Sequence, residues 1–266
     1  MINLTLYKRE MKGSIKLLII FAMIITMYVS IIVKMYDPEL METLDSFVEV
    51  MPEIMAAVGM SSGATSLLGF MISYLYGFIL LIFPMVFCIL RGNGLIAKYV
   101  DKGSMVSLMA APVKRDTIVF SQLSVLCSGV FMLVAYSTVV EIIVAEIFFN
   151  GELVIAELLA LNLGLLCLQL FIASICFLAS CMFSDTKYSI GFGAGIPALM
   201  YIINMLANVG GMAEKAKYFT FFTLFDAEGI VAGANSAILG CAVLFVGAVI
   251  IFVSSIMVFR NKDLYI

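Results

Sequence analysis

Long apolar runs separated by short polar segments dominate the chain. Six runs reach the length of about 20 predominantly apolar residues that a membrane-spanning helix needs. The runs lie at residues 16–36, 66–90, 116–148, 154–183, 188–210 and 233–259. The third is long enough to tilt or to extend past the bilayer. The pattern therefore predicts an all-α integral membrane protein, in which residues 1–266 form one domain with six transmembrane helices.

The composition supports this class and excludes several others. Of the 266 residues, 64% are hydrophobic and 12% are charged, and the net charge is only -3. Such a composition is typical of polytopic membrane proteins, and the small net charge gives no reason to expect a nucleic-acid partner. The chain has no histidine, and its six cysteines all fall inside apolar runs without a CxxC pair. We therefore expect no metal site, no disulfide scaffold and no catalytic triad.

The basic residues predict the orientation. If both termini lie on one side, 12 of the 15 lysines and arginines lie on that side, and only Lys34, Lys215 and Lys217 lie on the other. Cytoplasmic loops carry an excess of Lys and Arg, so both termini are expected to be cytoplasmic. The N-terminal apolar run lacks a signal-peptide cleavage site and is interpreted as a retained first span. A multi-pass protein of a bacterial plasma membrane fits these features.

Two segments outside the apolar runs have amphipathic patterns. Residues 3–16 alternate apolar and basic side chains and predict a short interfacial helix ahead of the first span. Residues 38–60 carry several acidic side chains, with apolar residues at helical spacing. We expect a helix on the outer membrane surface, broken at Pro52, which serves either as a packed cap or in substrate contact.

The charged segment 101–116 interrupts the apolar pattern between the second and third spans. Met105, Leu108 and Met109 are spaced as one apolar face of a short helix, and Pro112 would end that helix. The sequence predicts a short cytoplasmic helix that offers a partner an apolar stripe rimmed by charge. An ordinary positive-inside loop is the alternative.

Flanking residues fit the same picture. Asp101 or Ser104 would cap the N-terminus of this short helix by accepting backbone N–H bonds. Lys114 and Arg115 would hold the start of the third span at the cytoplasmic interface.

The segment resembles the cytoplasmic loop of ABC-2 type transporter permeases, in which an acidic residue and Gly-Thr are followed by leucines, Pro, Lys-Arg and Ile. The matching positions here are Asp101, Gly103, Ser104, Leu108, Pro112, Lys114, Arg115 and Ile118. The resemblance implies that the segment, with Lys102, Met105 and Met109, is a coupling helix that docks in a groove of a partner ATPase. Asp101 replaces the family's usual glutamate, and Gln122 stands where a lysine is common.

Three further stretches extend the resemblance over the whole chain. "YKREMK", which contains Lys8 and Glu10, is similar to the family's N-terminal interfacial helix. Residues 218–233 resemble the external segment before the last span, although Phe221 replaces the usual proline. "FRNKDLYI" resembles the closing signature of the family.

The resemblance implies the membrane subunit of an ATP-driven exporter. Two permease subunits would pair, more often as a homodimer than as a heterodimer, and each would bind one cytoplasmic ABC ATPase. The chain contains no GxxxxGK[ST] loop, so ATP and Mg would be bound by that partner and this subunit would catalyse nothing covalently. The expected substrate is an amphipathic, antimicrobial or toxin peptide, or a similar hydrophobic compound.

Two features inside the spans leave alternatives open. Glu141 is an ionisable residue within the third span, and such residues indicate function by default. It would either line a translocation path, bond to Asn162, or act with Glu146 in an ion-coupled transporter or channel, the rival to the exporter. Gly191 and Gly195 have the GxxxG spacing, which favours close helix packing either within the chain or with a second copy.

Overall fold

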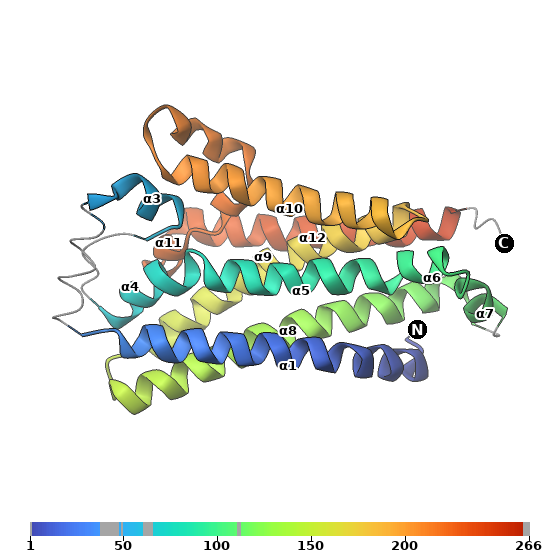
Figure 1. The fold of residues 1–266 in the computed structure, drawn as a ribbon, viewed down its shortest axis with the longest axis horizontal. Coiled ribbons are helices and arrows are strands. Elements are labelled where there is room, and N and C mark those ends of the chain that lie inside the picture. Colours follow the sequence, from blue (N-terminus) through green and yellow to red (C-terminus); the bar gives the residue numbers. More distant parts are fainter. Residues whose placement is uncertain (1, 38–47, 49, 61–65, 111–112, 263–266) are drawn as a thin grey trace.

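Six long helices run side by side along the molecule (Figure 1). The computed structural model describes residues 2–37, 48, 50–60, 66–110 and 113–262, and every regular element in these ranges is helical. The long helices are α1 (Leu4–Lys34), α5 (Ile79–Leu95), α8 (Arg115–Phe148), α9 (Ile155–Met182), α10 (Thr186–Asn208) and α12 (Asn235–Asn261). By length and composition, each can cross a membrane, with α5 extended by the short helix α6 (Ala97–Asp101). The prediction of a six-helix membrane protein is thus confirmed.

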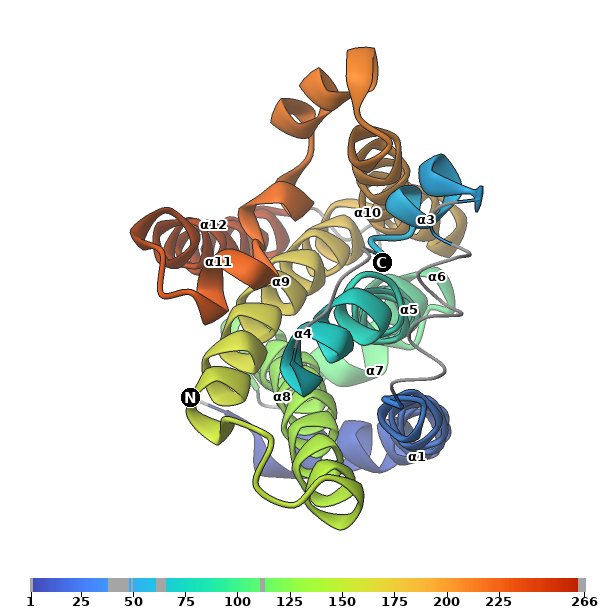
Figure 2. The same cartoon turned by 90° about the vertical axis from the view of Figure 1, so that its left-hand side faces the viewer.

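Helix α9 lies at the centre of the bundle and packs against α5, α8, α10 and α12 (Figure 2). Its buried face is rich in small side chains, including Gly164, Ala173, Ser174 and Ala179. Small residues let helix backbones approach closely, which matters in a bilayer because lipid removes most of the hydrophobic drive for helix association. In helices α1, α10 and α12 a much smaller share of the apolar window is buried, so more of their surface is exposed.

The first helix is continuous from Leu4 to Lys34, so the amphipathic residues 4–16 belong to the same helix as the first span. Its 31 residues make it about 46 Å long, more than the roughly 30 Å of a bilayer's hydrocarbon core. The charged N-terminal turns therefore belong to the same helix as the apolar span. Asn3 caps this helix, because its Oδ1 accepts from the backbone N–H groups of Thr5 (3.0 Å) and Leu6 (3.1 Å).

The second predicted span is broken near its start. Helix α4 (Leu67–Met71) continues into a π-helical segment, η1 (Ile72–Tyr76), and the chain turns at residues 77–78 before α5 begins. Gly77 allows this break, because a Cβ there would lie 2.8 Å from the carbonyl oxygen of Val58. The span expected at residues 66–90 is therefore two helical pieces joined at a close backbone crossing.

Helix α3 (Pro52–Ala57) begins at Pro52, where the sequence predicted a break. Proline suits the first position of a helix because its missing N–H has no partner there anyway. Residues 38–47 and 49 of the predicted surface helix lie outside the described residues.

A proline inside α5 is compensated by a side chain of α9. Pro84 has no N–H for the carbonyl of Leu80, four residues earlier. The side-chain amide of Gln169 donates to the carbonyls of Leu80 (3.3 Å) and Leu81 (3.0 Å) instead. Neighbouring helices commonly satisfy backbone groups that a proline frees inside a membrane.

The same arrangement recurs at the proline of α10. Pro197 frees the carbonyl of Gly193, and the thiol of Cys176 on α9 donates to that oxygen at 3.2 Å. Two of the central helix's buried polar groups thus repair backbone bonds that prolines remove from its neighbours.

The two ends of the bundle differ in their short elements (Figure 1). At one end lie the start of α1, helix α6, helix α7 (Met105–Ala110) and the end of α12. We call this the basic end, because the 12 basic residues grouped by the sequence analysis lie in or next to these elements, the end of α5 and the starts of α8 and α10. At the opposite end lie α3, α4 and three short elements, which are η2 (Gly211–Phe219), η3 (Phe221–Leu224) and α11 (Ala227–Val231).

Candidate functional site

At the basic end, a bend between α5 and α6 directs the following segment out of the bundle (Figure 1). The backbone departs from helical geometry at Ile96 (φ -120°, ψ -59°), which frees N–H groups at the start of α6. The hydroxyl of Ser180 on α9 accepts from the N–H groups of Ile96 (3.2 Å) and Ala97 (2.9 Å). The central helix therefore fixes the direction in which α6 leaves the membrane domain.

A buried charge cluster joins α1 to α5 and α6. Arg91 donates through Nη2 to the carboxylate of Glu10 at 2.8 Å and to the backbone carbonyl of Glu10 at 2.7 Å. The Tyr99 hydroxyl donates to the second carboxylate oxygen of Glu10. The side chains of Arg91 and Glu10 are only 14% and 8% exposed. Glu10, predicted as a residue of the coupling surface, thus acts in the structure as a buried link between helices.

The segment that follows α6 is tied to α10 as well. The carboxylate of Asp101 accepts a hydrogen bond from the Thr186 hydroxyl at 2.8 Å, at the start of α10. The Ser104 hydroxyl donates to the carbonyl of Tyr99 at 3.3 Å. Gly103 adopts a φ of 68°, a conformation that glycine accepts without strain, and so allows the chain to turn from α6 into α7. Neither Asp101 nor Ser104 acts as the N-cap that the sequence predicted.

Helix α7 has its apolar face turned towards the rest of the chain. Met105 is buried in the core and Leu108 packs partly against it. The predicted apolar stripe is therefore largely covered, because these side chains anchor α7 to the bundle. The outward surface of this helix is formed by Val106, Ser107 and Ala110.

The remaining residues predicted for this surface are placed as follows. Lys8 and Lys102 are exposed. Lys114 is the residue before α8, and Arg115 donates to the backbone carbonyl of Lys262 at 3.1 Å, which joins the start of α8 to the end of α12. Burial lowers the pKa of the Lys262 amine, which donates to the carbonyl of Cys181. The side chain of Met109 and all of Pro112 lie outside the described residues.

A second polar cluster is buried inside the bundle, towards the opposite end. Glu141 on α8 is 0% exposed, and one carboxylate oxygen accepts from the Tyr76 hydroxyl (2.8 Å) and from the Asn162 amide (2.9 Å). The Glu141–Asn162 bond was one of the alternatives that the sequence offered. The other carboxylate oxygen and the Asn162 carbonyl oxygen have no partner among the described residues. The cluster ties α8, α9 and the π-helical segment together.

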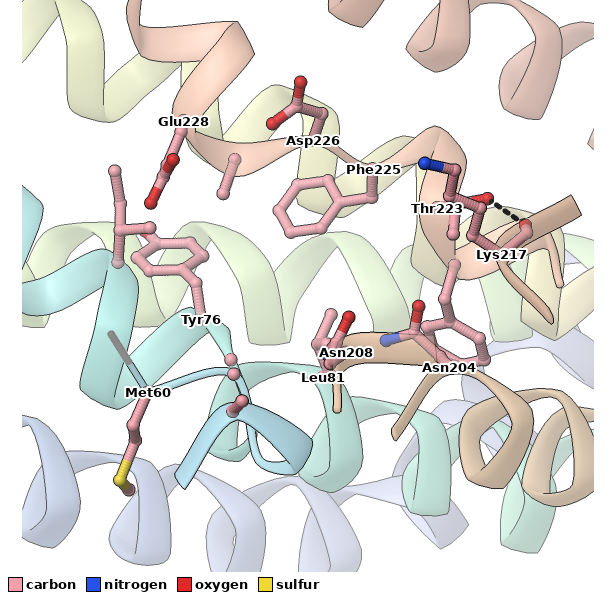
Figure 3. A pocket seen from close by; sticks show the side chains of 16 residues that line it. Met60, Tyr76, Leu81, Asn204, Asn208, Lys217, Thr223, Phe225, Asp226 and Glu228 are labelled. Atoms are coloured by element: carbon pink, nitrogen blue, oxygen red, sulfur yellow. Dashed lines mark hydrogen bonds between the residues drawn. The ribbon is translucent and has the colours of Figure 1, made fainter. Parts of the chain in front are cut away.

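A cavity of about 530 Å³ lies directly beside this cluster, at the opposite end. Figure 3 shows the rings of Tyr76 and Phe225 in its wall, with Asn204 and Lys217 further along and the carboxylates of Asp226 and Glu228 above. The Tyr76 ring lines the cavity while its hydroxyl bonds to Glu141. Glu141 itself is not a lining residue, so it contacts the cavity only through Tyr76.

One ion pair at the cavity rim is open to solvent. The Lys217 amine lies 2.6 Å from the carboxylate of Glu214 on η2 (Figure 3 shows Lys217). This pairing lowers the pKa of Glu214 and raises the pKa of Lys217. Exposed ion pairs contribute little to stability, so this pair adds little to the free energy of folding.

The two glycines of the GxxxG spacing make no close contact within the chain. A Cβ added at Gly191 or at Gly195 would meet nothing within 4 Å among the described residues. Gly193 between them is packed, with a Cβ position 3.0 Å from the Asn93 side chain. Of the two predicted uses of the spacing, the structure therefore does not show packing of Gly191 and Gly195 inside this chain.

Sequence reasoning missed three residues of these two polar clusters. Arg91 was counted only as a positive charge, Tyr99 was given no role, and Tyr76 was part of an apolar run. A lone arginine near the end of a span, about 80 residues from a lone glutamate in a basic helix, is a weak signal for their pairing. Nothing in the sequence around Tyr76 indicates a buried carboxylate partner.

Comparisons with protein-family models, with curated proteins and with solved structures found no match to this chain. The chain's role therefore has to be argued from its own residues and contacts.

Proposed function

We propose that the chain is the membrane-spanning permease subunit of an ATP-driven exporter, of the kind that its loop at residues 101–116 resembles. The observation that carries the proposal is the way in which α7 is attached to the bundle at the basic end. This short helix is anchored by Met105 and tied through α6 to α1 by Tyr99–Glu10 and to α10 by Asp101–Thr186. A force applied to α7 would therefore act through α6 on three long helices, which are α1, α10 and α5.

Such an attachment would allow the movement of a separate protein bound to α7 to be passed to the long helices. In this proposal the basic end is cytoplasmic, and a partner ABC ATPase, which binds ATP and Mg, contacts the outward surface of α7 at Val106 and Ser107. A second permease subunit pairs with the first, and the open glycines of α10 are available for that contact. ATP-driven movement of the two ATPases then moves the spans as rigid bodies and opens the opposite end.

The cavity at the opposite end supports a role in substrate release. Its walls combine aromatic rings with asparagines, a lysine and two carboxylates, which suits an amphipathic molecule with both apolar and charged groups. An amphipathic peptide or a similar hydrophobic compound is the substrate class that we propose.

The rival function, an ion-coupled transporter or channel that uses Glu141 and Glu146, has less support. The two residues are five positions apart on α8, so they do not share one face of the helix. Glu141 is fully enclosed by Tyr76, Asn162 and its other neighbours. The geometry offers no direct transfer between the two carboxylates.

Inverted vesicles from the native membrane separate the two functions. A fluorescent cationic amphipathic peptide is used as the probe, and its uptake is followed with ATP, with ATP plus ionophores, and with an ion gradient alone. We expect ATP-dependent uptake that survives ionophores and is lost in V106E, which places a charge on α7. The matched control, I54E, changes an exposed apolar residue at the opposite end and should retain uptake. Uptake driven by the ion gradient without ATP would contradict the proposal.

A further inference from the structure

A cavity between α5–α6 and α10 changes from apolar to basic along its length. It has a volume of about 360 Å³ and lies at the basic end. Ile89 and Leu90 on α5 and Ile190 on α10 form the apolar walls, and Lys98 and Lys102 lie further towards the end of the bundle. Leu90 and Ile190 are about half exposed, so this part of the cavity is open to the surface that lipid would cover.

The two lysines are free to bind a ligand. Lys98 and Lys102 are one helical turn apart on the same face, and both side chains are exposed. The structure records no hydrogen bond or ion pair from either amine to any described residue, and a neighbouring cavity of about 210 Å³ shares both lysines and Gly94.

Two acidic groups lie near the lysines. The Asp101 carboxylate, which also lines the cavity, accepts from the neutral Thr186 hydroxyl and keeps its negative charge, whereas the Glu10 carboxylate is paired with Arg91. Neither carboxylate is recorded in an ion pair with Lys98 or Lys102 among the described residues, so the two lysines of the cavity outweigh its one carboxylate.

The bend between the helices creates this arrangement. Ser180 holds the α5–α6 junction at Ile96 and Ala97, and Lys98 of α6 and Lys102, which follows α6, line the cavity together with residues of α5 and α10. Gly94 lies at the junction, and a Cβ there would meet nothing within 4 Å among the described residues, so the space beside the lysines is unfilled by them.

We propose that this cavity is a binding site for an anionic phospholipid of the leaflet at the basic end. Its phosphate lies between the amines of Lys98 and Lys102, and an acyl chain follows Ile89, Leu90 and Ile190. Basic pockets between transmembrane helices select anionic headgroups, and only a lipid satisfies both the apolar and the basic part of the cavity. The lipid would brace α6, and with it the adjoining α7, against α10.

The test is native mass spectrometry of the purified full-length protein released from nanodiscs. The discs contain phosphatidylglycerol and phosphatidylcholine in equal amounts, and retained lipids are counted. We expect one retained phosphatidylglycerol, with an apparent affinity that K98Q/K102Q lowers about 10- to 30-fold, as expected for two lysines at a membrane surface. K98R/K102R should retain binding, and I190N should weaken it, because the polar side chain disturbs the acyl wall.

The control variant is K12Q/K16Q, which removes the same charge from exposed positions of α1 at the same end. An equal loss in this control would show diffuse attraction and overturn the proposal. Competition by glycerol phosphate as strong as that by the whole lipid would show a site for free phosphate and would also overturn it. The proposal would also be overturned if K98Q/K102Q lost the copurifying ATPase but retained phosphatidylglycerol like the wild type. The melting temperature of every variant is measured in phosphatidylcholine discs, and only variants that melt with the wild type are used to compare lipid binding.

Discussion

The ion pair between Glu10 and Arg91 offers a quantitative test of how α1 is joined to α5 and α6. Replacement of either residue by glutamine leaves the other charge in a site that is almost closed to water, since the side chains are only 8% and 14% exposed. In E10Q, Arg91 keeps its bond to the backbone carbonyl of residue 10 but loses its counter-charge. In R91Q, the Glu10 carboxylate keeps only Tyr99 as a donor among the described residues.

The expected cost follows from this burial. Removal of one partner of a buried pair costs about 3–5 kcal/mol, and we expect the lower end of this range because Arg91 is still partly exposed. For a chain of this size, about 3 kcal/mol corresponds to a fall in the unfolding midpoint of about 6–12 °C. The double variant E10Q/R91Q removes both charges, so its loss should be at least about 2 kcal/mol smaller than the sum of the two single losses.

The cysteines provide the assay. Cys88, Cys176 and Cys181 are free and buried, so a thiol-reactive fluorophore labels them as the protein unfolds. Unfolding midpoints in detergent are measured for the wild type, the two single variants and the double variant. E214Q/K217Q serves as the control, because that pair is exposed and should leave the midpoint unchanged.

Strict additivity of the two single losses would refute the reasoning, since it would mean that Glu10 and Arg91 do not interact in the folded protein. Single variants that melt with the wild type would refute it as well.

The remaining predictions concern packing and buried polar groups, and the same midpoint assay checks each of them. Gln169→Leu should lower the free energy of unfolding by about 1–2 kcal/mol, because the Leu80 carbonyl, which has no N–H partner at Pro84, then loses its side-chain donor. The same Q169L change in a P84A background should cost less, because the alanine supplies the missing N–H. Equal losses in both backgrounds would show that the amide does not compensate for the proline. Gly240→Ala should cost about 1–3 kcal/mol, because its Cβ would overlap a backbone oxygen of η3. A neutral G240A would contradict this contact. Glu141→Ala should cost about 2–4 kcal/mol, because the Tyr76 hydroxyl loses its acceptor and the Asn162 amide keeps only the Leu158 carbonyl. Glu141→Gln should cost clearly less, so equal losses would exclude the hydrogen-bonding role.

The long helices were predictable because a bilayer imposes a simple length rule. The runs at residues 116–148 and 154–183 correspond within a residue or two to α8 and α9. The break in the second span was not predictable, since it depends on the close crossing of Gly77 with residues 58–59, a contact between segments that periodicity cannot pair. The amphipathic residues 4–16 join the first span in one helix, because nothing in the local sequence separates the basic turns from the apolar residues that follow them.

The candidate sites, too, were predictable from the sequence only where they depend on local pattern and not on tertiary contacts. The pattern around Met105 and Leu108 predicted a short helix with an apolar face, and that helix is present as α7. The sequence could not show that Met105 and Leu108 pack against the bundle, because burial depends on tertiary packing. The Glu141–Asn162 contact was predictable, since a buried carboxylate needs a donor and Asn162 lies on the next span. Its third member, Tyr76, was not.

The most direct test of the proposed function is to purify the tagged chain gently from its native membrane and to identify the proteins that accompany it by mass spectrometry. The account predicts a stoichiometric ATPase with a GxxxxGK[ST] loop, retained by the wild type and by I54E and lost from V106E. A chain that purifies without any ATPase, from membranes in which ATP-independent flux through it persists, would contradict the account.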